Sequence, residues 1–110
     1  DTDGTPLLPF DPRTGVVIED RWQRWLDWDP VRMVDHHADA LRGLHSIWID
    51  AGKSDEYYLD LGAEAFRAGL DRIGVPEDRI KFELVDGKHG DMHWRYPLAM
   101  HWLAGRLARD

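Results

Sequence analysis

Two short apolar runs, each followed by an amphipathic segment, most constrain what residues 45–108 can fold into. The run "LHSIWIDAG" is rich in Ile and Trp and ends at Gly52, so it predicts a buried strand at about residues 45–50. In "RIKFELVDG" apolar residues alternate with charged ones, which is typical of a strand with one buried face, and an edge position suits it. Strand, helix, strand and helix in this order predict an α/β fold with a parallel sheet and crossover helices.

The two helices of this core are predicted from apolar residues spaced three and four apart. The first covers about residues 56–73 and ends at Gly74. Its apolar side consists of Leu59, Ala63, Phe66, Leu70 and Ile73. The second has Pro97 at its start and runs over residues 98–107. Its predicted inward stripe consists of Tyr96, Met100, Leu103 and Leu107.

The chain is expected to be a single segment, residues 1–110, with a loop-rich opening at 1–19 and a strand-helix-strand-helix core at 45–108. Between them, Asp29 as N-cap and Gly43 as stop predict one continuous helix.

Two strands are too few for a stable open sheet of this type, which usually has several strands with helices on both faces. The chain also opens with "DTDGTPLLPFDPRTG", a loop-like mixture without an initiator Met, so we expect an excised piece. The pattern therefore predicts the last two parallel strands of a larger α/β fold, with their flanking helices.

The composition excludes several classes of protein. The formal net charge of −7 argues against a phosphate-binding surface, so no nucleic-acid partner is expected. The absence of cysteine excludes disulfides, thiolate metal sites and a cysteine nucleophile. No apolar run approaches the roughly 20 residues that span a bilayer, and no signal-peptide pattern opens the chain. We therefore expect a soluble protein without a membrane partner; its compartment is open, with the cytoplasm as the first expectation.

Polar side chains follow both predicted strands. The loop after Asp50 carries Asp55, and the loop after Asp86 carries His89. Parallel strands end at the same edge of a sheet, about 4.8 Å apart, and ligand sites of open α/β sheets lie there. Asp55 and His89 are therefore expected to meet, either as an orienting acid and a general base or simply as a tie between two turns. Asp50 and Glu56 are alternative acids, although Glu56 is expected to begin the next helix as a favourable N-terminal charge.

The stretches "DAGKSDEYYLDLGAEAFRAGLDRIGV" and "FELVDGKHGDMHWRYPLAMHWLAGRL" resemble the C-terminal part of the α/β-hydrolase fold, in the esterase group that includes enterochelin-esterase-like and esterase D-like enzymes. In that family a G-x-x-D turn presents the triad acid, which Gly52 to Asp55 match, and a Gly-x-His turn presents the triad histidine, which Gly87 to His89 match. "DGTPLLPFDPRTG" and "WDPVRMV" also resemble the segment before the acid-bearing strand. The resemblance covers nearly the whole chain and implies that Asp55 and His89 belong to a Ser-Asp-His triad for ester hydrolysis, without metal or cofactor.

The sequence departs from the family in its nucleophile. The family carries its serine earlier, in a G-x-S-x-G elbow, and no such motif occurs here. The chain's only serines, Ser46 and Ser54, lie outside any such elbow, and the oxyanion-hole donors are missing as well. We therefore expect the chain alone to be inactive and its partners to be the remainder of a parent hydrolase chain and an ester substrate.

A non-catalytic interaction module is the first alternative. A short helix follows Asp20, and Trp22, Trp25 and Trp28 on and after it are candidates for a partner-binding face, although tryptophan is equally common in cores. The exposed sheet edge at residues 45–50 is expected to support homo-oligomers if it is not otherwise paired.

A metal-binding domain is the second alternative, because His89, Asp91 and His93 are close in sequence and His36 and His37 lie on the earlier helix. A glycine between the first two of these ligands argues against the helical spacing that an H-x-x-x-H pair needs. We expect no metal, and we expect His93 to be a packing or surface residue.

Overall fold

The computed structural model describes Gly4 and residues 6–108, so that residues 1–3, 5 and 109–110, including part of the predicted loop-rich opening, lie outside the described residues. None of the helices in the described part of the chain combines the length and apolar character needed to cross a bilayer.

The chain divides into two compact units, residues 1–33 and residues 34–110. In the first unit a tight turn is closed by the backbone N–H of Asp11, which donates to the carbonyl of Val16 at 2.8 Å. Helix α1 (Glu19–Leu26) follows this turn, close to its predicted position. The opening of the chain therefore contains hydrogen-bonded structure of its own.

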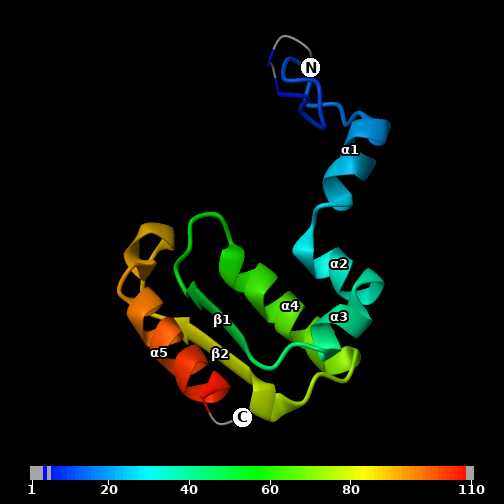
Figure 1. Ribbon diagram of the computed structural model, residues 1–110. Helices are drawn as coiled ribbons and strands as arrows, with labels where there is room; N and C mark the ends of the chain where they lie inside the picture. The colour runs from blue at the N-terminus through cyan, green and yellow to red at the C-terminus, as the bar shows by residue number, and fades with distance from the viewer. Residues whose placement is uncertain (1–3, 5, 109–110) are drawn as a thin grey trace. The chain divides into compact units, whose positions relative to one another are not determined.

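The second unit contains a two-stranded parallel sheet, as the sequence predicts. Strand β1 (Ile47–Gly52) pairs with β2 (Ile80–Val85) in one-to-one register along the whole length of both strands. Strand β1 begins two residues later than the predicted 45–50. Figure 1 shows the two strands between helices α4 (Leu59–Arg72) and α5 (Arg95–Leu107). A short 3₁₀ turn, η1, precedes β2. The small α/β class of the fold is thereby confirmed.

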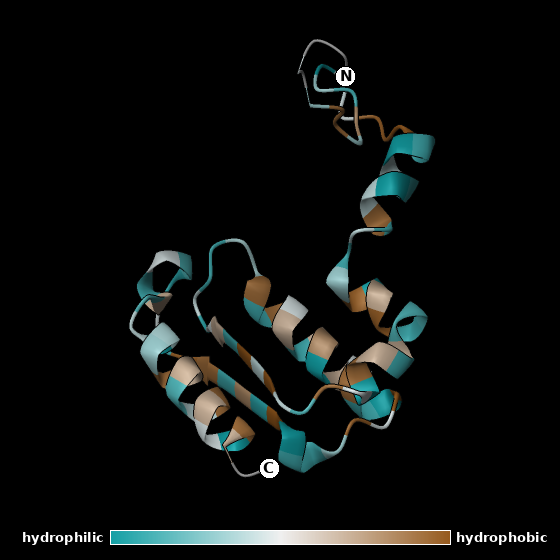
Figure 2. Cartoon of the chain, viewed as in Figure 1, coloured by the Kyte–Doolittle hydropathy of each residue, from teal (hydrophilic) through white to brown (hydrophobic). Residues whose placement is uncertain are grey.

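Side chains of the strands alternate between a polar and an apolar face, and Figure 2 shows this alternation along β2. Asp50 and its register partner Glu83 both contact Arg95 of α5, so the polar face lies toward α5. The neighbouring residues point to the other face, where α4 packs. These apolar side chains are Ile49, Ala51, Phe82 and Leu84.

Helix α4 agrees with the predicted inward side chains but begins later than the predicted residue 56. Leu70 is completely buried, whereas Leu59 at the helix start is 49% exposed. Tyr58, with φ 59° and ψ 31°, is left-handed and cannot be part of the helix. Its N–H donates to the carbonyl of Asp55 at 3.1 Å, and this turn delays the start of α4.

The inward stripe predicted for the last helix is wrong. Tyr96, Met100 and Leu107 are 70%, 68% and 62% exposed. Helix α5 also begins at Arg95, two residues before Pro97. Leu103, the fourth residue of the predicted stripe, is half-buried. Most of the apolar stripe therefore does not lie against the sheet.

The side chains one position earlier face the sheet instead, because one residue is a rotation of about 100° around a helix. Arg95 binds carboxylates of both strands, and the Trp102 ring stacks edge-on against Trp48 with centroids 5.8 Å apart. Arg106 donates to the hydroxyl of Ser46 at 3.3 Å. Since this face of the sheet is polar, guanidinium and indole groups satisfy it better than an aliphatic stripe would.

The single helix predicted between Asp29 and Gly43 is also wrong. The structure has two helices, α2 (Pro30–His36) and α3 (Ala38–Arg42), because His37 lies outside the helical region at φ −115° and ψ 23°. The predicted cap is present: the Asp29 carboxylate accepts a hydrogen bond of 3.0 Å from the N–H two residues on.

Two contacts of the second unit explain the bend at His37. Arg72 pairs with Asp35 of α2 at 2.9 Å, and Arg42 of α3 donates to the carbonyl of Ile73 at 3.1 Å. In one straight helix, positions 35 and 42 would lie about 10 Å apart along the axis, whereas their partners are adjacent in the chain. The bend lets both contacts form at the C-terminal end of α4.

The hydrophobic core of the second unit is small. Among the described residues the buried hydrophobic side chains are Val34, Ala51, Leu70 and Val75. Val34 packs against the backbone of Gly69, where an added Cβ atom would lie 3.2 Å from the Val34 methyl groups. This core positions α4 on the sheet and leaves the α5 side to polar contacts.

Candidate functional site

Main-chain hydrogen bonds hold the loops after β1 and β2 side by side. The N–H of Lys53 donates to the carbonyl of Val85 at 2.8 Å, and the N–H of Ser54 donates to the carbonyl of Gly87 at 3.1 Å. The pairing of the strands therefore continues past the end of β1. Both loops leave the sheet at its carboxyl edge.

Gly52 allows the close approach of these loops. A Cβ atom at this position would lie 2.4 Å from the carbonyl oxygen of Gly87 and 2.9 Å from its carbon. Gly87 itself has φ +150°, which glycine adopts readily and other residues rarely do. Glycine at both positions is therefore a requirement of the backbone.

Asp55 is fixed on all sides at the start of the first loop. Its side chain is only 3% exposed. Oδ1 accepts a hydrogen bond of 2.8 Å from the backbone N–H of Tyr57, and Oδ2 lies 3.0 Å from Nδ1 of His89. The backbone N–H of Asp55 donates to the carbonyl of Gly52 at 3.1 Å. The structure thus brings together the two side chains that sequence reasoning singled out.

Electrostatics determine the charge of Asp55 and the direction of its hydrogen bond with His89. Burial raises the pKa of Asp55, but the hydrogen bonds from the Tyr57 N–H and from His89 outweigh it, so that the pKa lies below its ordinary value. An ionised carboxylate only accepts hydrogen bonds, so Nδ1 of His89 donates, and in the neutral imidazole the lone pair lies on Nε2. This is the tautomer in which a histidine acts as a general base.

His89 begins the 3₁₀ turn η2 (His89–Met92) and its side chain is half exposed. Its backbone N–H donates to Oε2 of Glu56 at 3.1 Å. The ring of Tyr57 lies edge-on to the imidazole, with centroids 5.2 Å apart and an interplanar angle of 84°. Sequence reasoning missed both contacts: it considered Glu56 only as an alternative acid or a helix N-terminal charge, and nothing in the pattern distinguishes Tyr57 from other exposed loop residues.

The structure gives both alternative acids other partners. Oδ2 of Asp50 accepts from Nε1 of Trp48 at 2.8 Å and from Nε of Arg95 at 2.9 Å. Glu56 binds the main chain of His89 and not its ring. Asp55 is therefore the acid of the candidate pair.

Arg95 is a further residue that sequence reasoning missed. It is 7% exposed, pairs with Asp50 at 2.9 Å and with Glu83, and lies over the rings of Trp48 and Trp94. Burial lowers the pKa of Arg95, but the two carboxylates outweigh it and raise the pKa above its ordinary value. The charges that alternate along β2 were the available signal, since a half-buried carboxylate requires a cation nearby.

A hollow of about 530 Å³ opens beside the Asp–His pair. Asp55 and His89 lie in its wall, and most of the remaining lining is apolar. The apolar lining includes Trp48, Leu59, Met92, Tyr96, Met100 and Leu103. A substrate or a further part of a protein could therefore reach the exposed imidazole from this side.

The residues of the metal-site alternative have other partners in the structure. Nδ1 of His93 donates to the carbonyl of Gly90 at 2.9 Å, and the Asp91 carboxylate accepts the N–H of Lys88 at 2.9 Å. Over Gly4 and residues 6–108, no group of three or more His, Cys, Asp or Glu side chains is placed to hold a metal ion. The geometry gives no support to a metal site there.

Neither serine lies in a nucleophile elbow. Ser46 precedes β1, at the opposite end of the strand from Asp55, and its hydroxyl lies 2.8 Å from Nδ1 of His45. Ser54 is exposed in the loop beside Asp55. The chain thus presents an acid and a histidine without an elbow serine.

We compared the chain with models of protein families, with curated proteins and with solved structures, and none of the three comparisons found a match. The candidate site therefore stands on its geometry and chemistry alone.

Proposed function

We propose that this chain is the C-terminal part of a serine hydrolase of the α/β-hydrolase type, and that Asp55 and His89 are the acid and the histidine of its Ser-Asp-His triad. The contact of 3.0 Å between Asp55 Oδ2 and His89 Nδ1, at the carboxyl edge of a parallel sheet, carries the proposal. The G-x-x-D turn at Gly52 and the Gly-x-His turn at Gly87 support the same assignment.

In the proposed reaction, Nε2 of His89 takes the proton of the serine hydroxyl as its oxygen attacks the ester carbonyl. The same proton then passes to the leaving alcohol, and the serine is left acylated. In the second half of the reaction, water hydrolyses this acyl-serine. Asp55 holds the tautomer of His89 and stabilises the imidazolium. The serine and the oxyanion donors belong to the parent chain.

The uncovered apolar surface of the second unit supports a larger parent. Four hydrophobic side chains are buried among the described residues, which is a small core for a chain of this length. Tyr96 and Met100 of α5 are largely exposed and line the hollow beside β1. In the described residues the sheet has only β1 and β2, so one edge of β1 is open for a further strand.

The decisive experiment is on the parent chain, whose gene is expected to encode a G-x-S-x-G motif after an apolar strand upstream of Asp1. The parent should hydrolyse p-nitrophenyl acetate and react with a fluorophosphonate probe. His89→Ala is expected to lower kcat by about 10³-fold or more. Residues 1–110 alone should show no turnover.

Two results would contradict the proposal. One is a parent chain that neither hydrolyses esters nor reacts with the probe. The other is ester turnover by residues 1–110 alone that is lost in His89→Ala, since this would show that no further nucleophile is needed.

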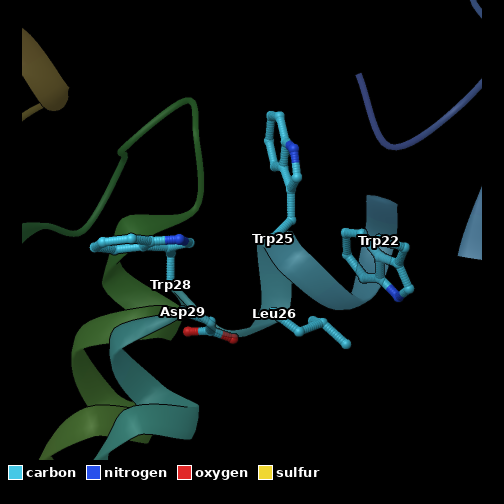
Figure 3. A pocket seen from close by; sticks show the side chains of 5 residues that line it. All are labelled: Trp22, Trp25, Leu26, Trp28 and Asp29. Atoms are coloured by element: carbon cyan, nitrogen blue, oxygen red, sulfur yellow. The ribbon is translucent and has the colours of Figure 1, made fainter. Parts of the chain in front are cut away.

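A partner-binding module is the second candidate function, because the tryptophans of the first unit are exposed. Trp22, Trp25 and Trp28 are 40%, 52% and 81% exposed. With Leu26 and Asp29 they line a hollow of about 540 Å³, and Figure 3 shows the three indole rings projecting from α1 and the turn that follows it. Exposed tryptophan is typical of binding hot spots. If a second copy of the chain is the partner, Trp28→Ser should lower the sedimentation coefficient, and an unchanged coefficient would count against this candidate.

A further inference from the structure

Three consecutive loop residues contact His89 at three different points. Asp55 binds ring atom Nδ1, Glu56 accepts the backbone N–H at 3.1 Å, and Tyr57 lies edge-on to the ring. The sequence predicted that Glu56 begins a helix, but α4 starts three residues after it. The carboxylate of Glu56 therefore does not serve as a helix N-terminal charge, and its contact is with the other loop.

The turn η2 closes on the residue before His89: the Lys88 carbonyl accepts from the N–H of Asp91 at 3.1 Å, and the Lys88 N–H donates to the Asp91 carboxylate at 2.9 Å. Neither of these bonds is made by His89 itself.

The main chain at His89 lies between Gly87, at φ +150°, and Gly90, and glycine permits more backbone conformations than any other residue. The N–H of Ser54 holds Gly87, two residues before the histidine. Beyond that point, the carboxylate of Glu56 connects the main chain of His89 to the loop of the acid.

Glu56 is suited to this contact by its charge. Its own backbone N–H and the N–H of His89 both bond to the carboxylate and lower the pKa of Glu56 below its ordinary value. Glu56 is therefore ionised at neutral pH. A hydrogen bond to a charged acceptor is about twice as strong as one between neutral groups.

The backbone conformation of Tyr58 lets all three residues face the histidine. At φ 59° it is left-handed, which is rare for a bulky side chain, and its N–H closes a turn on the carbonyl of Asp55. Residues held in such conformations cluster at functional sites. The turn ends the loop after Tyr57 and sends the chain into α4.

We propose that Glu56 is a positioning residue, which fixes the main chain of His89 so that the imidazole stays on Asp55 with Nδ1 donating. The catalytic consequence of this role rests on the proposed function. The positioning itself is a property of residues 1–110 and can be measured without a substrate.

The test is NMR spectroscopy of the ¹⁵N-labelled chain at neutral pH, with two readouts at His89: the ring ¹⁵N shifts, which report the tautomer, and the exchange rate of the backbone amide. In Glu56→Ala the amide should exchange about tenfold faster, and the ring shifts should move toward tautomer-averaged values. Glu56→Gln keeps an acceptor oxygen and should restore most of both readouts. Glu64→Ala, which removes an exposed carboxylate of α4, should change neither.

Unchanged ring shifts and amide exchange in Glu56→Ala would overturn the proposal. If Glu56→Ala does not fold, as judged by the methyl signals of Val34 and Leu70, acid titration of the wild-type chain decides. The His89 amide proton should then shift as Glu56 protonates, and this shift should be absent in Glu56→Gln. A wild-type amide that does not respond also overturns the proposal.

Failure of the proposed function gives a different pattern. A parent chain without esterase activity, combined with faster exchange in Glu56→Ala, would reject the hydrolase and keep the positioning role. In an active parent, Glu56→Ala should lower kcat with little change in KM, and Glu56→Gln should restore kcat.

Discussion

At the scale of single residues, a glycine and a carboxylate determine whether the Asp–His pair forms. Gly52 brings the loop of Asp55 within contact of the loop of His89, and the buried carboxylate then orients the imidazole. The first effect is steric and the second electrostatic, so they can be tested separately.

Gly52→Ala should separate the two loops. Its Cβ would meet the carbonyl oxygen of Gly87 at 2.4 Å, and because that atom belongs to the main chain it cannot rotate away. We expect a loss of about 2 kcal/mol or more in the free energy of unfolding, measured by urea denaturation. Gly62→Ala is the matched control: no atom lies within 4 Å of its added Cβ, and alanine should stabilise α4 by about 0.5–1 kcal/mol. Equal effects at both positions would show that the loops are not in close contact.

Asp55 should make the stability of the chain depend on pH. Because the pKa of its carboxyl is lower in the folded state than the unfolded value of about 3.9, its stabilising contribution is present above the unfolded pKa and is lost as the pH falls through the folded one. Asp55→Asn should be less stable than the wild type at neutral pH. The difference should shrink as the pH falls from about 5 toward 2.

Asp78→Asn, which changes an exposed carboxyl, is the control and should follow the wild-type curve. A difference between Asp55→Asn and the wild type that stays constant over the whole acid range would show that the Asp55 carboxylate gains nothing from its partners in the folded state.

At the scale of elements, the sheet separates two kinds of packing. Helix α4 covers the apolar face, with Leu70 at the centre of a small hydrophobic core. Helix α5 covers the polar face, where Arg95 joins Asp50 of β1 to Glu83 of β2. Attachment of α5 therefore depends on charge pairing as well as on the edge-on contact of the Trp102 ring with Trp48.

Arg95→Met should leave two partly buried carboxylates without their cation. We expect a loss of about 2–3 kcal/mol in the free energy of unfolding, since breaking a buried ion pair by removing one partner exposes the desolvation penalty of the other. The triple variant Arg95→Met, Asp50→Asn, Glu83→Gln should recover most of this loss. Failure of the triple variant to recover stability would show that the arginine acts through packing on Trp48 and Trp94 and not through charge.

Much of the element order could be predicted from the sequence, because the apolar residues recur at the spacing of the element that they form. In β2 they recur every two residues, as at Phe82 and Leu84, and in α4 with a period of about 3.6, as at Phe66 and Leu70. The face of α5 that packs on the sheet could not be predicted. The apolar pattern favours the stripe that contains Met100, whereas the sheet offers this helix a polar surface. The meeting of Asp55 with His89 follows from topology.

The role of Glu56 could not be predicted, because it depends on the left-handed conformation of Tyr58, which no local residue preference signals. Similarly, the bend at His37 follows from the contacts of Asp35 and Arg42 with α4 and not from local preference.

At the scale of the whole molecule, the apolar stripe on α5 is an exposed surface suited to association. Tyr96, Met100 and Leu107 are each exposed by more than half. Contiguous exposed apolar surface of this kind marks an interaction site or promotes self-association.

Met100→Glu should therefore reduce self-association and the binding of the dye ANS, as measured by light scattering and fluorescence. Stability should change by less than about 0.5 kcal/mol because the side chain is exposed. His101→Glu adds a negative charge at an exposed position of α5 about 100° around the helix from Met100 and should leave both readouts unchanged. A wild-type chain that is monomeric and binds no dye would show that the stripe is not an uncovered interface.

The two hydrogen bonds that continue the strand pairing into the loops, from Lys53 to Val85 and from Ser54 to Gly87, involve only main-chain atoms. Up to Gly87, the spacing of the two loops is therefore largely independent of the side chains at positions 55 and 89. Evolution or protein engineering could exchange the carboxylate and the imidazole for another reactive pair, and these main-chain bonds together with Glu56 would still hold the two loops side by side.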